Sequence, residues 1–379
     1  VLEAELDAPL ARLTRKGSPP GSSWTGTGDE MGTPVEYAEL HCHSNFSFLD
    51  GASHPEDLVA RAAALDYTAL AITDRDGLYA AVRLDVAAKE HNIRPIFGSE
   101  VTLEDQSRLT LLARDVHGYQ NLSLMLTAGR RARPKGESAV SLEVLARHTA
   151  GLIALTGSFD GRIPRLLLAG DERGAREAAG QLLELFGQES VYLEVTDHLL
   201  PAEAAIRNRM VGLARVMDLP LVATQDARYA IPDGRRLHDV LTCIRHHTHL
   251  QAAGTRLMPN GEYFLQPKET LATRFRALPE AIRNTVAIAD QCRMTLADLD
   301  CSLPDYPVPV PFRSALEYLE HLTFLNAPTR FPEVNARVVQ QLRHELEVIG
   351  RHRLEGYFLI VWDIMKFCHD QGLLAQGRG

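Results

Sequence analysis

The stretch HCHSNFSFLDGAS, residues 41–53, directly follows a short strand-like run that begins at Tyr37. Alternate residues of an extended chain point to the same side, so His41 and His43 can face one ion together, and Asp50 adds a carboxylate a few residues later. A lone His-x-His pattern is more often an ordinary polar strand end than a ligand pair. The sequence around it must therefore decide.

Short apolar runs alternate with helical patterns from residue 37 to about residue 229. Strand-like runs lie at residues 69–73, 94–98, 109–112, 151–155, 191–195 and 219–224, and helical patterns lie at 55–65 (with Ser53 as its cap), 78–91 and 202–217. This alternation predicts a parallel α/β sheet or barrel, in which active-site residues gather at the C-terminal ends of the strands. Asp74, Glu100 and Asp226 follow such strands, and converging carboxylates suit divalent metals.

The composition is that of a globular protein with no general attraction to nucleic acid. The chain has 379 residues, 45% of them hydrophobic, and a formal net charge of −9, so any DNA contact must come from local patches. The five cysteines are not spaced as a metal knuckle, which indicates reduced thiols. No apolar run is long enough to cross a bilayer, and we expect a cytoplasmic protein without a membrane partner.

The sequence divides into three parts. Residues 1–34 are rich in Gly, Ser, Thr and Pro and predict a disordered leader, within which Met31 is a candidate natural start. Residues 35–250 hold the strand–helix alternation. Residues 251–379 are mostly helical and include a Pro-rich extended linker at 303–311 and amphipathic helices around 334–349 and 357–367.

The motifs of the first region resemble the polymerase-and-histidinol-phosphatase (PHP) family. They are residues 41–53, AITDRDGLY at 71–79, LLARDVHGYQNL at 111–122, GLIALTG at 151–157 and VATQDARY at 222–229, in the family's order. The resemblance implies a distorted (β/α)7 barrel that holds up to three metals. It places the family's ligand pattern on His41, His43, Asp50, Glu100 and Asp226.

Four positions depart from the family's ligand pattern. Arg75 and Arg228 stand where the family has His, Ser158 stands where it has Cys or His, and Arg108 replaces another His. Arginine cannot ligate a metal and repels a dication nearby. We therefore expect Arg75, Arg108 and Arg228 to neutralise the carboxylates and the barrel to bind zinc or manganese weakly or not at all.

The end of the chain resembles a second family element. GYFLIVWDIMKF at residues 356–367 and Ala375-Gln376-Gly377-Arg378-Gly379 resemble the entry into the polymerase palm of bacterial DNA polymerase III alpha subunits. The resemblance implies that Gly377, Arg378 and Gly379 begin a turn that contacts the incoming nucleotide. The Gln-Gly-Arg-Gly form resembles the error-prone branch of the family.

The two resemblances together predict a DNA-directed DNA polymerase, a nucleotidyltransferase of replication and repair with a structural barrel. They imply Mg²⁺, DNA and deoxynucleoside triphosphates as cofactor and substrates, and a sliding clamp and damage-response factors as accessory partners. The family's catalytic aspartates lie beyond residue 379, so we expect no catalytic residue and no polymerase activity in these 379 residues alone.

Other readings remain open. The barrel could be a metal-dependent PHP phosphoesterase or 3′–5′ exonuclease, or the chain could act only as a binding module. Two further signals read as surface features: His246, His247 and His249 as a solvated helix end, and Arg130, Arg131, Arg133 and Lys135 as an exposed basic loop.

Overall fold

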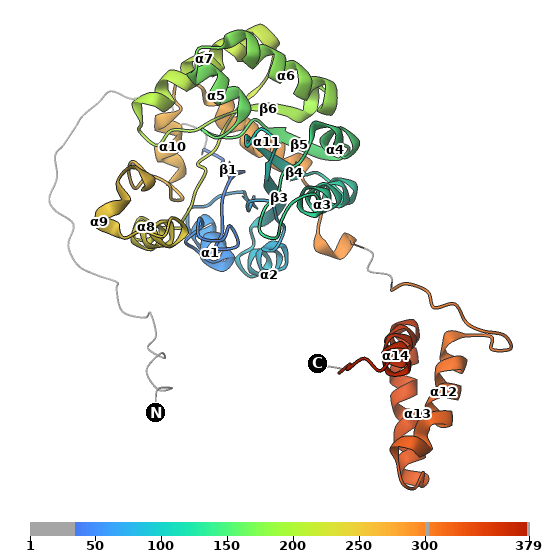
Figure 1. Cartoon of the computed structure of the whole chain (residues 1–379). Coiled ribbons are helices and arrows are strands. Elements are labelled where there is room, and N and C mark those ends of the chain that lie inside the picture. Colours follow the sequence, from blue (N-terminus) through green and yellow to red (C-terminus); the bar gives the residue numbers. More distant parts are fainter. Residues whose placement is uncertain (1–34, 300–302, 377–379) are drawn as a thin grey trace, which may run out of the picture. The chain divides into compact units, whose positions relative to one another are not determined.

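The computed structural model describes residues 35–299 and 303–376. Two compact units make up the chain, one ending at Arg293 and one beginning at Met294 (Figure 1). The predicted leader at 1–34 and the predicted nucleotide-contacting residues Gly377, Arg378 and Gly379 lie outside the described residues.

The first unit is built on one seven-stranded sheet whose strands neighbour each other in chain order. Its strands are β1 (Ala38–Glu39), β2 (Ala69–Ile72), β3 (Arg94–Thr102), β4 (Arg108–Ala113), β5 (Leu152–Leu155), β6 (Val191–Val195) and β7 (Leu221–Ala223). The segment after β1 pairs with the segment after β7. The His43 N–H donates to the Ala227 carbonyl at 2.8 Å, and the Ala227 N–H donates to the His41 carbonyl at 3.2 Å. The sheet therefore curls into a barrel, as predicted.

The barrel is not wholly parallel. β4 runs antiparallel to both β3 and β5, whereas the remaining pairs are parallel. Only five residues, 103–107, separate β3 from β4. A link this short suits an antiparallel hairpin, since a parallel pair needs a crossover of a dozen residues or more. The parallel arrangement predicted for the sheet or barrel therefore does not hold at β4, although the fold class is confirmed.

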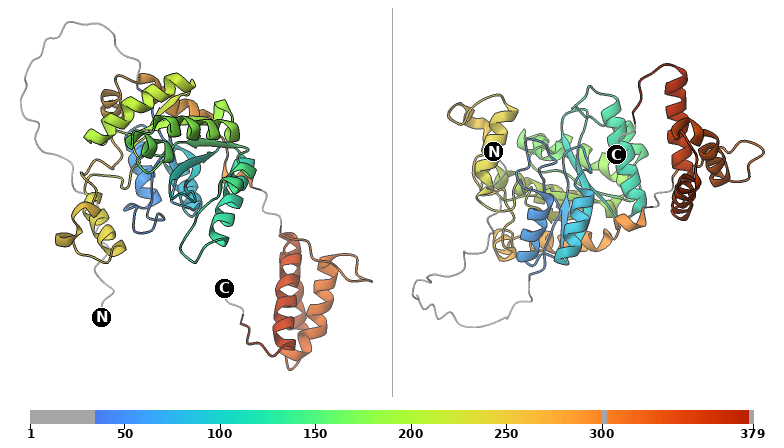
Figure 2. Two further views of the ribbon diagram at one scale, coloured as in Figure 1. Left: turned by 45° about the horizontal axis from the view of Figure 1, so that its top comes forward. Right: turned by 90° about the horizontal axis from the view of Figure 1, so that it is seen from below.

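Helices surround the sheet on the outside in all three ribbon views (Figures 1 and 2). The first unit contains α1 (Pro55–Ala64), α2 (Ala81–His91), α3 (Val116–Arg131), α4 (Leu142–Arg147), α5 (Arg162–Leu168), α6 (Glu172–Phe186), α7 (Pro201–Met217), α8 (Gly234–Arg245), α9 (Leu250–Ala253), α10 (Lys268–Arg274) and α11 (Pro279–Gln291), with 3-10 turns at Gln188–Ser190 and Gly254–Arg256. None of the helices in the described parts is long and apolar enough to span a membrane.

The expected cap of α1 was misplaced by one residue. His54 precedes the helix and its N–H donates to the Asp57 carboxylate at 3.2 Å, while the Ser53 hydroxyl accepts from the Ala230 N–H at 2.9 Å. Ser53 therefore ties the first strand–helix loop to the segment after β7, which helps to close the barrel.

The core of the first unit extends beyond the boundary expected near residue 250. Ile288 and Ala289 of α11, and Cys292 directly after it, share one buried cluster with strand residues such as Ala38 and Val222. The Thr285 hydroxyl accepts from the Ala38 N–H at 3.1 Å, which fixes α11 to β1. The compact unit therefore ends at Arg293, because α11 covers apolar strand residues that would otherwise face water.

The second unit is helical. After a 3-10 turn (Leu296–Asp298) it contains α12 (Ala315–Arg330), α13 (Ala336–Arg351) and α14 (Glu355–Asp370), and residues 303–309 form neither helix nor strand, as the prolines predict. Leu319, Leu322, Leu346 and Leu359 form its buried core. The helices predicted around 334–349 and 357–367 are confirmed as α13 and α14.

Candidate functional site

The site begins in the loop of residues 44–53 that follows β1. The Asp74 carboxylate, placed at the end of β2, accepts from the Ser44 N–H and hydroxyl at 2.8 and 2.6 Å and from the Ser47 hydroxyl at 2.7 Å. Gly51 lets the loop fold back, since a Cβ there would lie 1.9 Å from the Ser44 carbonyl oxygen. Asp74 is thus a loop organiser, with its oxygens already satisfied by serines.

The predicted ligand residues converge at the ends of β1, β3 and β7. His41 Nε2 lies 3.2 Å from His43 Nε2 and 3.6 Å from both Glu100 Oε1 and Asp226 Oδ1. His43 Nε2 lies 3.5 Å from the same Asp226 oxygen. One ligand atom each from His41, His43 and Glu100 falls within a 4.8 Å group, so these three residues have the spacing of a metal site.

The two histidines have opposite pKa shifts. Burial opposes a charge on His41, but the carboxylates of Glu194 and Asp226 outweigh it and raise its pKa. Burial, together with the nearby Arg228 guanidinium, lowers the pKa of His43. The acidic residues therefore act mainly on His41, and Arg228 acts on His43.

Arginine side chains form ion pairs with the carboxylates of this cluster. Arg228 donates to Asp50 at 2.7 Å and forms an ion pair with Asp226, also at 2.7 Å. Arg75 approaches Asp50 at 2.8 Å and Glu100 at 3.3 Å. Burial would raise the pKa of Asp50, but Arg228 and Arg75 outweigh it and hold that pKa far below its usual range. A metal ion at this site would therefore have to displace ion pairs that already neutralise these carboxylates.

Of the two remaining predicted positions, Ser158 lies in the cluster and Arg108 does not. The Ser158 hydroxyl donates to Asp226 at 2.6 Å and therefore belongs to the cluster. Arg108 forms no ion pair with the predicted carboxylates. It lies 3.8 Å from a different carboxylate, that of Asp76, and donates to the Thr102 hydroxyl. Arg108 was expected to neutralise the cluster, but β4 begins at this residue and directs it toward the β3–β4 turn instead.

Two members of the cluster were missed in the sequence. Glu194 on β6 accepts from His41 Nδ1 at 2.6 Å, and Arg245 at the end of α8 donates to Asp50 at 2.8 Å. Glu194 is the one acidic residue in the apolar strand of residues 191–195, and that anomaly could have revealed it. Arg245 gave no such signal, since 195 residues separate it from Asp50.

The cluster combines acidic and basic groups. Its carboxylates are four, Asp50, Glu100, Glu194 and Asp226, and its guanidinium groups are three, Arg75, Arg228 and Arg245. Chemically, the arrangement has the donor types of a metal site but satisfies them with protein cations.

A curled seven-stranded α/β barrel with histidines and carboxylates at its strand ends is the architecture of a PHP domain, and residues 39–198 match the PHP domain family. Residues 317–379 match the bacterial DNA polymerase III alpha NTPase domain. The predicted resemblance to both families is therefore confirmed.

Curated relatives match nearly the whole chain. An error-prone DNA polymerase of Symbiobacterium thermophilum is 39% identical over 91% of this chain, and one of Pseudomonas aeruginosa is 40% identical over 90%. A DNA polymerase III subunit alpha of Treponema pallidum is 32% identical over 91%. The chain spans about one third of each relative's length, 33%, 32% and 31% in that order.

Among solved structures, a putative metal-dependent phosphoesterase from Bifidobacterium adolescentis aligns with 51% of this chain and 88% of its own. The two are 19% identical and superpose with a TM-score of 0.38.

Proposed function

We propose that this chain is the N-terminal part of a DNA-directed DNA polymerase of the error-prone branch, and that its PHP barrel is a scaffold without hydrolytic activity. The family match and the relatives' names support the polymerase assignment. One observation carries the scaffold assignment: Arg228 and Arg75 pair directly with Asp50, Asp226 and Glu100.

Metal binding would have to displace these pairs. Arg228 is only 5% exposed, so losing its carboxylate partners would leave a buried guanidinium without compensation. A dication would also sit beside the Arg75 charge. The ion pairs therefore favour the metal-free state.

A second candidate is a metal-dependent PHP phosphoesterase or 3′–5′ exonuclease. The grouping of His41, His43 and Glu100 favours it, and Glu194 would orient His41 through Nδ1, as partners of metal-bound histidines do. A zinc or manganese ion held there would supply Lewis-acid chemistry. This candidate requires Arg75 to release Glu100.

The remaining features of the proposal follow from the polymerase assignment. Mg²⁺ would serve the polymerase reaction, DNA and deoxynucleoside triphosphates would be substrates, and a sliding clamp and damage-response factors are the accessory partners. A cytoplasmic location belongs to the same proposal. Residues 35–250 would be the PHP domain and residues 251–379 the beginning of the polymerase domain, with α11 of the latter completing the barrel.

Metal content and two activities test the proposal. We expect the purified chain to retain no stoichiometric zinc or manganese after dialysis and to hydrolyse neither a generic phosphoester nor single-stranded DNA. The gene product that carries this chain should extend a primer on a DNA template with Mg²⁺. Stoichiometric metal together with hydrolysis that is lost in His41→Ala would establish the second candidate instead.

A further inference from the structure

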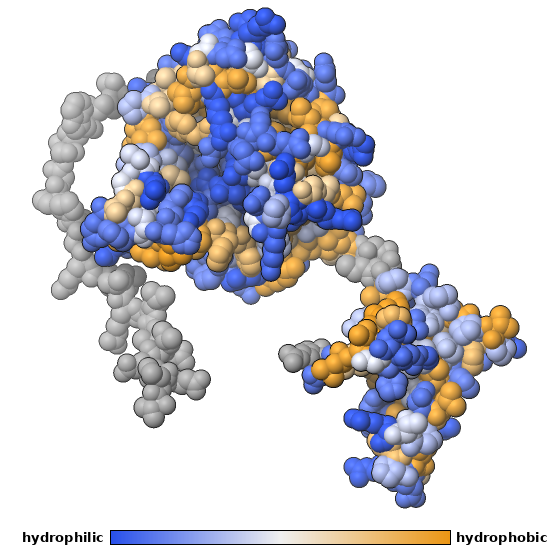
Figure 3. Space-filling model, in the orientation of Figure 1, coloured by the Kyte–Doolittle hydropathy of each residue, from blue (hydrophilic) through white to orange (hydrophobic). Residues whose placement is uncertain are grey.

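The helix α8 presents an apolar face to solvent. Leu237, Val240 and Ile244 recur at the spacing of one helix face, and they are 50%, 42% and 52% exposed. Ile231 precedes the helix and Leu250 follows it, and both are about as exposed, 47% and 50%. Figure 3 shows hydrophobic residues along the lower edge of the first unit, where Figure 1 places α8.

The inward face of α8 carries polar side chains, which reverses the pattern of an ordinary surface helix. His238 and Thr242, one turn apart, are 1% and 0% exposed, and the His238 ring lies 5.9 Å from the Tyr229 ring between centroids. Burying a leucine, valine or isoleucine side chain stabilises a fold by about 1.5–3 kcal/mol. The stability of this unit alone would therefore place the apolar residues inward, whereas a partner that covers the outward face accounts for the reversal.

The surface around this face carries positive charge. Arg236 on α8 and Arg256 after α9 are both exposed. From residue 240 to residue 261 the sequence contains no Asp or Glu, although acidic residues outnumber basic ones by 49 to 40 in the whole chain. Three histidines of this stretch are also exposed, His246, His247 and His249. A partner with acidic side chains around an apolar centre would therefore match this surface in charge.

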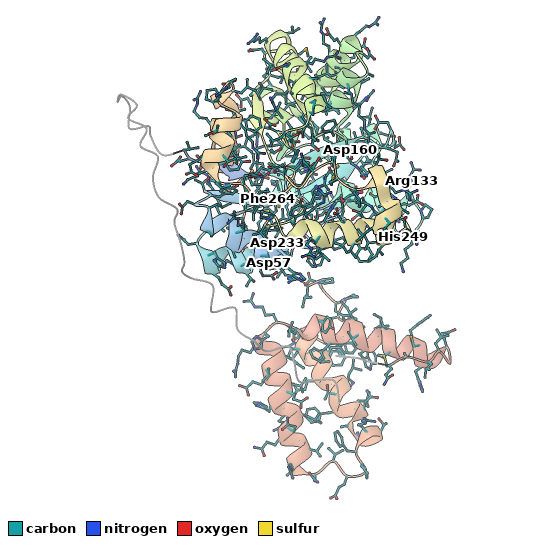
Figure 4. All side chains as sticks on the ribbon, turned by 90° about the vertical axis from the view of Figure 1, so that its left-hand side faces the viewer. Asp57, Arg133, Asp160, Asp233, His249 and Phe264 are labelled. Carbon is teal, nitrogen blue, oxygen red and sulfur yellow. The ribbon has the colours of Figure 1, made fainter. Side chains whose placement is uncertain are left out.

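The shape and composition of the face favour a helix as the partner. In Figure 4 the labelled Asp233 and His249 mark the two ends of α8, which runs along an outer edge of the first unit. The twelve-residue helix is about 18 Å long, and its apolar residues form one straight row. They are aliphatic, so they offer no aromatic ring on which a nucleic acid base could stack. Such a row suits the apolar face of another amphipathic helix.

We propose that the outward face of α8 is a docking surface for an acidic amphipathic helix of a partner protein. Leu237, Val240 and Ile244 are the apolar anchors, and Arg236 pairs with a carboxylate at the rim. The side chains of this surface are separate from the His41 cluster, and the proposal is independent of the polymerase assignment.

A labelled synthetic peptide, titrated with the whole chain and followed by fluorescence anisotropy, tests the proposal. The peptide carries leucine at helical positions i, i+4, i+7 and i+11 and glutamate and alanine elsewhere. We expect saturable binding that weakens by about tenfold in Leu237→Ser and in Ile244→Ser, because each loses an apolar contact. Val86→Ser, at an equally exposed position on α2 (52%), is the matched control and should bind like the unchanged chain.

The contribution of charge is measured separately. Arg236→Gln should weaken binding several-fold, whereas Arg173→Gln, at an exposed arginine on α6, should not. A peptide with lysine in place of glutamate should bind about tenfold more weakly at low salt, and the difference should shrink as salt is added.

Four outcomes would overturn the proposal. The acidic peptide may fail to saturate the chain, or Leu237→Ser and Ile244→Ser may both bind it as the unchanged chain does. Displacement of the peptide by a single-stranded oligonucleotide from the unchanged chain, with no oligonucleotide binding to Ile244→Ser, would assign the face to nucleic acid. A dimer of the unchanged chain in sedimentation that is lost in Ile244→Ser would assign it to a second copy.

Discussion

At the scale of single residues, the centre of the barrel places arginine side chains among buried carboxylates. A metal site holds several carboxylates together by placing positive charge among them. Here Arg75 and Arg228 supply that charge from within the chain, and Arg245 adds to it. On the proposed function, the pattern of His and acidic residues survives while arginine takes the place of a metal ion.

Arg228→Met should reduce the stability of the first unit by about 3–5 kcal/mol, because it leaves Asp50 and Asp226 buried without their closest cation. Arg245→Met should cost much less, about 1 kcal/mol, since its side chain is 32% exposed. Urea denaturation followed by a probe in the barrel measures both. Equal losses of stability in the two variants would show that the buried Arg228 ion pairs contribute no more than the exposed Arg245 pair.

Returning histidine to two positions should restore metal binding. In the double variant Arg75→His with Arg228→His, zinc at a hundredfold excess over its Kd should add about 3 kcal/mol of stability, and it should add nothing measurable to the unchanged chain. Thermal melts with and without zinc report this. A double variant of exposed arginines, Arg131→His with Arg236→His, controls for added histidine. Zinc stabilisation there would refute the argument.

His238 gives the first unit a dependence on pH. Burial lowers its pKa to about 4, and among the described residues neither ring nitrogen has a hydrogen-bond partner. The unfolded chain takes up a proton at this residue near pH 6.5 and the folded one does not, so stability falls as pH drops from about 6.5 toward 4. The loss between pH 7 and 5 should be about 2 kcal/mol larger in the unchanged chain than in His238→Gln.

The comparison for His238 is a set of denaturation curves at both pH values. His91→Gln, an exposed site on α2, should keep the full pH dependence of the unchanged chain. If His238→Gln keeps it too, another group is responsible.

At the scale of helices and strands, the local sequence pattern predicted most of the individual elements. The strand-like runs and the helices at 55–65, 78–91 and 202–217 are present because each pairs a matching apolar period with turn residues at its ends. The convergence of His41, Glu100 and Asp226 followed from the rule that strand ends meet. The direction of β4, the partner of Arg108 and the contact of Arg245 did not, since each depends on packing between distant segments.

The three-helix unit offers a simple test of its core. Leu359→Ala on α14 should cost about 2–5 kcal/mol, because Leu359 is fully buried among Leu319, Leu322 and Leu346. Leu374→Ala, at a fully exposed leucine beyond the same helix, should change stability by less than about 0.5 kcal/mol. Helical circular dichroism during urea titration distinguishes them; similar effects would mean that the described core does not stabilise this unit.

At the scale of the whole molecule, the position of α11 changes where the chain can be divided. A fragment of residues 35–293 should unfold cooperatively, whereas one of residues 35–250 should be aggregated or molten, because it exposes the strand residues that Ile288, Ala289 and Cys292 cover. Thermal unfolding and gel filtration of the two fragments test this. A cooperative, monomeric 35–250 fragment would restore the boundary expected from sequence.

The closure of the barrel also has a consequence for folding during synthesis. The His43–Ala227 bond and the Ala38–Thr285 bond join segments made early to segments made late. At about 5–20 residues per second, the ribosome needs roughly ten to fifty seconds to pass from β1 to α11. Until the segment after β7 emerges, the chain beside β1 lacks its closing partner, and the nascent chain carries an open sheet edge of the kind that favours aggregation.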